Sequence, residues 1–235
     1  MEKIPLTKAI ANSGFCSRRK AEELIRLKKV LVNNEPAQLG DRVNSSDSIK
    51  IKNKEVFFKK NQDLYIILNK PRGYVCTNRK FKNEKSIFDL IAEKQKLIII
   101  GRLDKESEGL TLLSSDGDLT YKLSHPKFEH EKKYLVKTDN HQISFKTIEK
   151  SFLQGINIQE KTLAKAKIIK EKGKFNYEII LTQGLNRQIR KMFLNFNIQV
   201  INIKRVAIAS LDLGNLPLGK YRYLDKNEVN ELKKS

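Results

Sequence analysis

The sequence predicts an α+β protein whose larger part contains a mostly antiparallel sheet. Two stretches, residues 17–29 and 186–196, space their apolar residues with helical periodicity. Elsewhere, short apolar runs with partial alternation are separated by glycine or asparagine, as the strands of hairpins are. A polar segment at residues 61–63 divides the chain into two blocks. We therefore expect two domains, residues 1–60 and residues 64–235.

The first block predicts two short helices followed by a short-stranded hairpin. Pro5 suits the first turn of a helix and Gly14 its end. Ser17 can cap a second helix, "SRRKAEELIRLKK", whose apolar residues fall at i, i+3 and i+4. Asn33 and Asn34 indicate a turn. The second helix starts with three basic residues, Arg18, Arg19 and Lys20. They predict either a surface that binds nucleic acid or an ordinary solvated surface.

The second block opens with a buried strand, "LYIIL" at residues 64–68, followed by the basic turn "NKPRGYVCT". Another apolar run, "LIII" at residues 97–100, leads into "GRLDKESEGLTLL". Arg102 and Asp104 thus stand at the end of a predicted strand, and the next strand begins five residues after the aspartate. Further strands are predicted in "KYLVKT", "LAKAKIIK", "FNYEIILT" and "VINIKRVAI", with Gly173 as a hairpin turn.

The helix predicted in "NRQIRKMFLNF" combines a buried face with cationic side chains. Its apolar residues at i, i+3, i+4 and i+7 are Ile189, Met192, Phe193 and Phe196. Arg187 and Arg190 lie about one turn apart on other faces. Beside a carboxylate, such an arginine would keep the acid ionised by lowering its pKa. The alternative is an ordinary amphipathic helix with solvated arginines.

Charge narrows the class of partner. The chain has 235 residues with 47 lysines and arginines against 27 aspartates and glutamates, a net charge of +20. Such an excess favours nucleic acid as the partner, and both blocks are basic. No stretch approaches the roughly 20 apolar residues of a membrane span, and the first residues lack the apolar core of a signal peptide. We therefore expect a cytoplasmic protein without membrane contact.

Several chemistries lack their usual motifs. The sequence contains no GxxxxGK[ST] or GxGxxG, and no GxSxG or HExxH. Cys16 and Cys76 are far apart, and the three histidines lack metal-ligand spacing. We therefore expect chemistry that uses ordinary side chains, with neither a metal nor a cofactor, and this directs attention to Asp104.

Five motifs, in this order, resemble those of the RsuA-type ribosomal RNA pseudouridine synthases, and most closely the RluF type: "LNKPRGYVCT", "GRLDKESEGLTLLSSDGDLTYKL", "HEKKYLV", "GLNRQIRKMF" and "LPLGKYRYL". The resemblance spans nearly the whole chain. It implies a small alpha-L RNA-binding domain followed by a pseudouridine synthase catalytic domain with a mostly antiparallel mixed sheet flanked by helices. The implied reaction detaches uracil from its ribose, turns the base and rejoins it through carbon. The implied substrate is a stem-loop of ribosomal RNA, in the large (23S) subunit.

The resemblance also implies roles for single residues. Asp104 matches the catalytic aspartate, where the residues alone would also allow a turn or N-cap aspartate. Tyr134 matches the tyrosine that stacks on the flipped uracil, and Arg190 the arginine that pairs with the aspartate, with Arg187 as the alternative. Arg102 would fill the vacated stack or clamp a phosphate. The other expected substrate contacts are Asn186, Lys70, Arg72 and Lys105.

One catalytic carboxylate favours isomerisation over glycoside hydrolysis, which usually uses two. Asp116 and Asp118 are accordingly expected to be turn and helix-start residues. Two alternatives stay open, the same reaction on a transfer RNA uridine and a non-catalytic RNA-binding factor for ribosome assembly. The target uridine, the choice between free RNA and a pre-ribosomal particle, and the atom that Asp104 attacks first also stay open. We expect a monomer.

Overall fold

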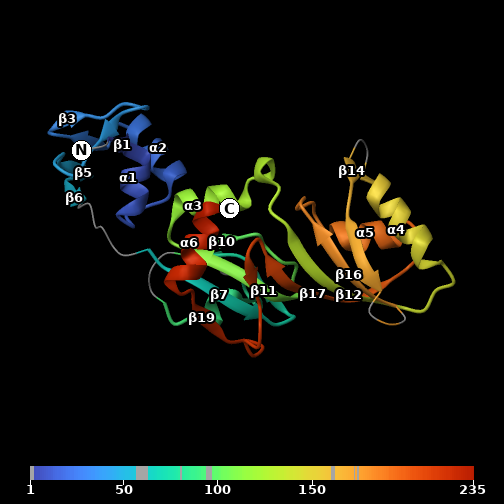
Figure 1. Ribbon diagram of the computed structural model, residues 1–235. Coiled ribbons are helices and arrows are strands. Elements are labelled where there is room, and N and C mark those ends of the chain that lie inside the picture. The colour runs from blue at the N-terminus through green and yellow to red at the C-terminus, as the bar shows by residue number, and fades with distance from the viewer. Residues whose placement is uncertain are drawn as a thin grey trace. The chain divides into compact units, whose positions relative to one another are not determined.

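A computed structural model of the chain describes residues 3–56, 63–79, 81–93, 97–159, 162–171, 173 and 175–235. The chain divides into two compact units, residues 1–62 and residues 63–235. Both are drawn in Figure 1. Of the linker expected at residues 61–63, only Asp63 lies within the described residues. None of the helices in the described parts of the chain is long and apolar enough to cross a membrane.

The first unit packs two helices against short strands. α1 (Leu6–Asn12) and α2 (Arg18–Arg26) share one hydrophobic cluster with a four-stranded sheet and with the β1–β4 pair. The sheet has the order β3 (Glu35–Pro36), β2 (Val30–Val32), β5 (Ile49–Ile51), β6 (Lys54–Val56). Beside it, β1 (Ile4–Pro5) pairs with β4 (Arg42–Val43).

Local sequence explains how these elements begin and turn. Ser17 Oγ accepts a hydrogen bond from the Lys20 backbone N–H at 3.3 Å, which caps α2 as predicted. Asn33 and Asn34 have φ values of 52° and 70° and form the tight turn between β2 and β3. Asparagine tolerates this left-handed backbone better than most residues. The predicted pair of helices and hairpin is confirmed.

A nine-stranded mixed sheet forms the frame of the second unit. Seven strands follow the order β15 (Lys167–Glu171), β16 (Asn176–Leu181), β12 (Lys132–Thr138), β17 (Val200–Ile208), β11 (Glu108–Ser114), β7 (Tyr65–Lys70), β19 (Tyr221–Tyr223). β10 (Ile98–Ile100) pairs with β11, and β18 (Leu211–Asp212) pairs with β17. β11 and β17 run parallel, and the other pairs of this sheet are antiparallel. The predicted α+β class with a mostly antiparallel sheet is confirmed.

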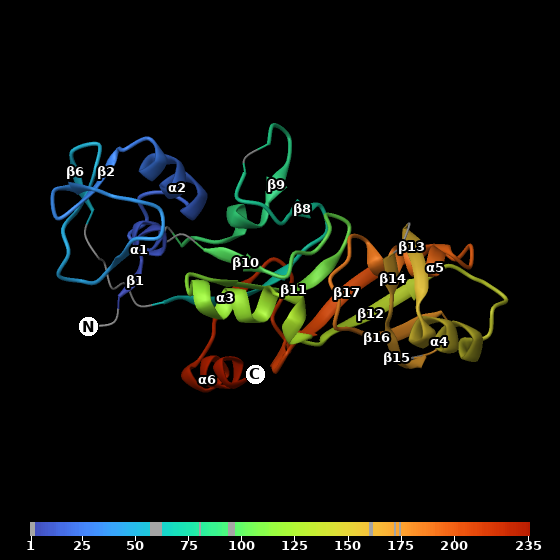
Figure 2. The ribbon, with the colours of Figure 1, turned by 90° about the horizontal axis from the view of Figure 1, so that it is seen from above.

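The sheet buries side chains on both faces. Ile66 and Leu68 of β7 join one hydrophobic cluster with α4 (Phe145–Gln154) and α5 (Gln188–Leu194). Ile67 joins a second cluster with α3 (Gly117–Ser124) and α6 (Lys226–Lys234). This alternation follows from the two-residue period of a strand. Figures 1 and 2 show α4 and α5 at one end of the sheet, and α3 and α6 toward the other.

The remaining elements of the second unit are short. β8 (Tyr74–Val75) pairs with β9 (Lys85–Ser86), and β13 (Ile156–Gln159) pairs with β14 (Thr162–Ala164). The 3-10 helices η1 (Ile87–Leu90) and η2 (Pro126–Phe128) follow β9 and α3.

One predicted strand is two. The stretch "LAKAKIIK" contributes to β14 and to β15, which pair with different partners. Lys165, between them, donates its backbone N–H to Gln183 Oε1 at 3.0 Å, and its carbonyl accepts from Gln188 Nε2 at 2.8 Å. Because glutamine side chains pair with the backbone N–H and carbonyl of Lys165, the strand can be interrupted there without leaving these two groups unpaired.

Candidate active site

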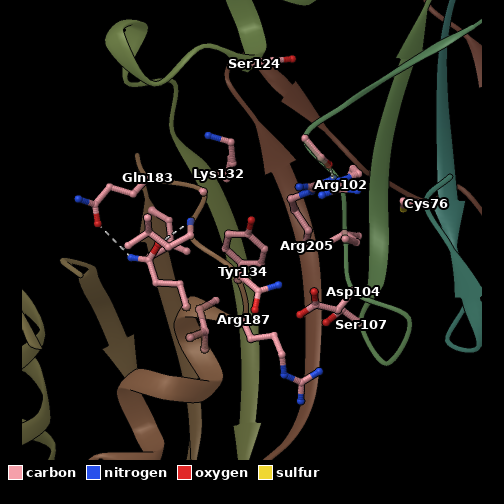
Figure 3. A pocket seen from close by; sticks show the side chains of 18 of the residues that line it. Cys76, Arg102, Asp104, Ser107, Ser124, Lys132, Tyr134, Gln183, Arg187 and Arg205 are labelled. Atoms are coloured by element: carbon pink, nitrogen blue, oxygen red, sulfur yellow. Dashed lines mark hydrogen bonds between the residues drawn. The ribbon is translucent and has the colours of Figure 1, made fainter. Parts of the chain in front are cut away.

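A cavity of about 1140 Å³ opens on the second unit, lined by the β10–β11 connection, β12, β17 and the start of α5. Asp104 enters it from the β10–β11 connection and Tyr134 from β12. Figure 3 shows the Asp104 carboxylate and the Tyr134 ring pointing into the same space. Arg102 and Arg187, which the sequence analysis expects to contact substrate, also line the cavity.

Hydrogen bonds from Ser107 and Lys70 fix the β10–β11 connection that carries Asp104. The Ser107 backbone N–H donates to the Asp104 carbonyl at 3.1 Å, which closes a turn. Lys70, at the end of β7, donates its ammonium to the carbonyls of Ser107 at 2.6 Å and Pro71 at 3.0 Å. Asp104 itself is half-buried, so its carboxylate is held on a fixed turn with one side open to the cavity.

The phosphate contact expected of Lys70 is wrong. The side chain is 0% exposed, and its ammonium is surrounded by backbone carbonyls, so no phosphate can reach it. Burial lowers the pKa of Lys70, while the nearby Cys76, Glu106 and Asp104 act to raise it. Lys70 therefore stabilises the β10–β11 connection from within the protein and is not accessible to RNA.

Arg187 and Arg190 both lie near Asp104, but within the described residues neither forms an ion pair with it. Arg187 precedes α5 with a left-handed φ of 53°, and its Nη1 lies 3.0 Å from Glu106 Oε2. Arg190 donates from Nη1 to the Val200 carbonyl at 2.7 Å. The predicted pairing of an arginine with Asp104 stays a prediction.

The pKa of Arg190 reports its surroundings. Burial lowers it first, and the charge of Arg187 lowers it further, whereas Asp104 and Glu106 raise it. Its Nε is buried and has no hydrogen-bond partner among the described residues. A buried donor without a partner costs free energy, and the Arg190 Nε–H can still donate one hydrogen bond.

The other predicted contacts fall in two places. Arg72, Lys105 and Asn186 are exposed in the second unit, and Lys105 forms an ion pair with Glu84 at 3.0 Å. The exposed basic residues at the start of α2, in the first unit, are Arg18, Arg19 and Lys20. These residues are accessible, as an RNA contact requires.

Asp116 has the structural role that the sequence predicts. Its Oδ1 accepts from the backbone N–H groups of Asp118 and Leu119, both at 3.0 Å, and so caps α3. Among the aspartates that the structure describes, Asp104 is the one that lines the cavity. In the part of the chain that the structure describes, no group of three or more histidine, cysteine, aspartate or glutamate side chains could hold a metal.

Comparison with known proteins places this geometry in a family. The family model for RNA pseudouridylate synthase matches residues 64–195, and the S4 domain model matches residues 4–49. The chain is 36% identical over 233 residues to the dual-specificity RNA pseudouridine synthase RluF of Escherichia coli K12, covering 97% of this chain and 78% of that protein. The chain belongs to the RNA pseudouridine synthase family.

Two further relatives agree. The chain is 38% identical over 235 residues to the ribosomal large subunit pseudouridine synthase B of Bacillus subtilis, covering 97% of this chain and 95% of that protein. A crystal structure of a pseudouridylate synthase superposes with a TM-score of 0.70 at 28% identity, covering 97% and 99% of the two chains. The pseudouridine synthase fold and enzyme class predicted from the sequence are confirmed.

Two cationic side chains that line the cavity of this pseudouridine synthase, Arg205 and Lys132, are not predicted from the sequence. Arg205 of β17, 1% exposed, donates from Nε to the Leu110 carbonyl at 2.7 Å and from Nη2 to the Gly101 carbonyl at 2.6 Å. Lys132 of β12 donates from Nζ to the His130 carbonyl at 2.9 Å. Both line the cavity. Burial lowers the pKa of Lys132, and the charge of Arg205 lowers it further.

Strand periodicity could have identified both residues. Lys132 stands two residues before Tyr134, so the two share a face of β12. Arg205 stands two residues after the buried Ile203 in the apolar run "VINIKRVAI", so these two share a face of β17. An arginine at an inward position of such a run indicates a functional or structural site, because isolated charges are rarely buried.

Proposed function

We propose that this chain isomerises a uridine of ribosomal RNA to pseudouridine, and that the target lies in large-subunit (23S) RNA. The observation that carries the proposal is the half-buried aspartate, Asp104, in a cavity that is also lined by Tyr134, the half-buried Lys132 and the buried Arg205. The large-subunit assignment is supported by the relative that is named a ribosomal large subunit pseudouridine synthase. Ribosomal RNA as the substrate favours a cytoplasmic enzyme.

In the proposed mechanism the target uridine leaves its stack and enters the cavity. Flipping costs roughly a few kcal/mol, which is lowest for an unpaired base. The Tyr134 ring is positioned to stack on the flipped uracil, and its low exposure of 8% means that the ring is already held in place. Arg102, exposed at the cavity rim, would fill the vacated stack or hold a neighbouring phosphate.

The Asp104 carboxylate is the proposed catalytic group, as a nucleophile whose bond to the substrate forms and breaks again within one cycle, and as the base that takes the proton from C5. In the reaction the bond between ribose C1′ and uracil N1 breaks, and the electron pair stays with the base. The base then turns, and its C5 forms the new bond to C1′. The proton on C5 is removed, and N1 gains a proton, so the product is an isomer and no co-reactant is consumed.

The cations of the cavity would stabilise the detached base. Uracil carries negative charge when its bond to the sugar has broken, and positioned positive groups lower the energy of such a species. Lys132 and Arg205 line the cavity, and the buried Lys70 lies under its catalytic loop. Arg190 is proposed to hold Asp104 in its ionised, correctly oriented form.

RNA binding is proposed to use both units. Arg72, Lys105 and Asn186 are exposed beside the cavity, and the S4 match supports a similar role for the basic start of α2. The charge of +20 predicts that affinity falls steeply as salt rises. We propose that the enzyme acts as a monomer. A transfer RNA uridine is a second candidate target, and the relative named a dual-specificity RNA pseudouridine synthase supports testing more than one class of RNA.

Chemical labelling of pseudouridine followed by primer extension tests this proposal. Protein-free large-subunit ribosomal RNA, total transfer RNA and pre-ribosomal particles would each be incubated with the wild-type chain. A new stop in large-subunit RNA supports the proposal and identifies the uridine. A stop in transfer RNA alone would move the substrate to that class. Salt-sensitive binding without a stop in any of the three would favour a non-catalytic assembly factor.

A further inference from the structure

Four rings gather where α3 ends and η2 begins. The Tyr121 and His125 ring centroids lie 5.0 Å apart, those of Tyr121 and Phe128 lie 6.0 Å apart, and those of Phe128 and His130 lie 6.1 Å apart. Tyr121 is 52% exposed and Phe128 36% exposed. This aromatic cluster (Tyr121, His125, Phe128 and His130) therefore presents ring surface to solvent.

Packing of the core does not explain the cluster. Neither Tyr121 nor Phe128 belongs to the hydrophobic clusters found among the described residues. A lysine lies over the two rings instead, with the Lys127 ammonium 4.7 Å from the Phe128 centroid and 5.3 Å from the Tyr121 centroid. Exposed rings next to a cation are typical of surfaces that bind single-stranded nucleic acid.

The cluster is continuous with the active-site cavity. His125, Pro126 and His130 line that cavity, and Tyr121 and Phe128 line a neighbouring hollow of about 430 Å³. Ser124, at the last turn of α3, marks the same end of the cavity in Figure 3, away from Arg187. RNA seated in the cavity would therefore pass over these rings.

The charges around the hollow favour RNA. Lys122 and Lys233 line it together with Asp116 and Asp118. The Asp116 carboxylate is satisfied internally, because it accepts from Tyr65 and from the first turn of α3. The Lys233 ammonium lies 3.9 Å from the Asp116 carboxylate, and Lys122 donates to the Lys233 carbonyl at 2.9 Å. Lys127, beside the rings, is therefore the cation that the phosphates of a strand crossing the rings would meet.

We propose that the aromatic cluster stacks on unpaired nucleotides of the substrate RNA that adjoin the flipped uridine. The inference rests on the proposed function and specifies its substrate class, an RNA with single-stranded nucleotides beside the target. Every base has a π face, so these contacts would favour an open strand over a duplex and would tolerate different sequences. His130 is part of the motif match, and this proposal gives it a role at the junction of cluster and cavity.

The test compares binding of a fluorescein-labelled oligouridine strand with binding of an RNA duplex of equal length. The variant Tyr121→Leu/Phe128→Leu keeps apolar bulk but removes both π faces. Tyr223→Leu is the matched control, since Tyr223 is 47% exposed and lines neither hollow. Both changed positions are exposed, so folding is expected to survive, and thermal melts with each single variant would verify it.

We expect the double variant to bind the strand roughly 5- to 100-fold more weakly than wild type, and the duplex within about twofold. The salt slope of binding should be unchanged, because both substitutions are neutral, whereas Lys127→Ala should reduce it by about one. Equal binding of the strand by variant and wild type, or equal losses on strand and duplex, would overturn the inference. Binding does not depend on turnover, so absence of pseudouridine formation would sink the proposed function separately.

Discussion

Arg187 is paired with Glu106 rather than with Asp104, with its Nη1 3.0 Å from Glu106 Oε2. Both side chains are nearly half exposed, at 45% and 49%, so the pair contributes at most about 1 kcal/mol. Arg190 is held differently, half-buried and donating to the Val200 carbonyl at 2.7 Å. Of the two arginines, Arg190 is the one with the fixed position that a catalytic pair requires.

Substitutions of the two arginines should therefore have different effects on kcat. Arg190→Gln is expected to lower kcat on the order of 100-fold, because it removes the charge that we propose to pair with Asp104. Arg187→Gln is expected to change kcat less than about fivefold, since it breaks only an exposed ion pair. Single-turnover and steady-state rates on the mapped RNA measure both. A larger loss for Arg187→Gln would assign the pairing role to Arg187.

Tyr134 is expected to act mainly through its ring face. Tyr134→Phe keeps the ring on β12 and should retain much more activity than Tyr134→Ala. The alanine variant also leaves a void in the main hydrophobic cluster, which should cost roughly 3 kcal/mol of unfolding free energy. Urea unfolding and activity would be measured for both variants. Equal activity of the two variants, under conditions where urea unfolding shows both to be folded, would argue against stacking.

The contact between β11 and β17 requires glycine at position 109. A Cβ there would lie 2.2 Å from the Arg205 carbonyl oxygen, and φ is already +106°. Gly109→Ala should therefore destabilise the chain by roughly 3 kcal/mol or more and displace Arg205. Gly219→Ala is the control, with φ +77° but open space around its Cβ, and should cost only about 1 kcal/mol. Similar losses in urea unfolding would contradict the close approach.

Lys132 should make stability depend on pH. Its pKa is lowered from 10.5, chiefly by burial, so the unfolded chain binds a proton over a range where the folded chain has released it. The contribution of Lys132 to the free energy of unfolding of the wild-type chain therefore rises with pH through that range. Lys132→Met does not titrate, so its stability relative to wild type should fall from neutral pH toward 10.5. Urea unfolding at several pH values measures the free energy of unfolding of Lys132→Met minus that of wild type, and a value that stayed constant or rose with pH would be inconsistent with a desolvated ammonium.

Much of the frame follows from sequence patterns because they report local geometry. The run "VINIKRVAI" coincides with β17, and Ser17 and Asp116 cap the helices that they precede. Gly173, with φ +86°, lies in the predicted turn between β15 and β16. The sequence patterns do not predict α4 or α6. The helix expected from residue 186 begins only at Gln188, because Arg187 before it has a left-handed backbone.

The site is less predictable where its residues depend on tertiary contacts. "NKPRGYV" shows that Lys70 is charged, but its burial depends on carbonyls of Lys105 and Ser107, far along the chain. In the same way, the pairing of Arg187 depends on Glu106, which the sequence places beside Asp104 without indicating its partner. Periodicity locates a side chain on a face, whereas partners across the sheet become known only when the chain is folded.

The central claim is that the Asp104 carboxylate performs the reaction. The most direct test compares Asp104→Asn with Glu106→Gln, the same change of acid to amide two residues away, in single-turnover pseudouridine formation on the mapped RNA. We expect no detectable product with Asp104→Asn, RNA affinity within about twofold of wild type because phosphate contacts are intact, and most of the activity with Glu106→Gln. Product formation by Asp104→Asn at a rate near that of wild type would contradict the account.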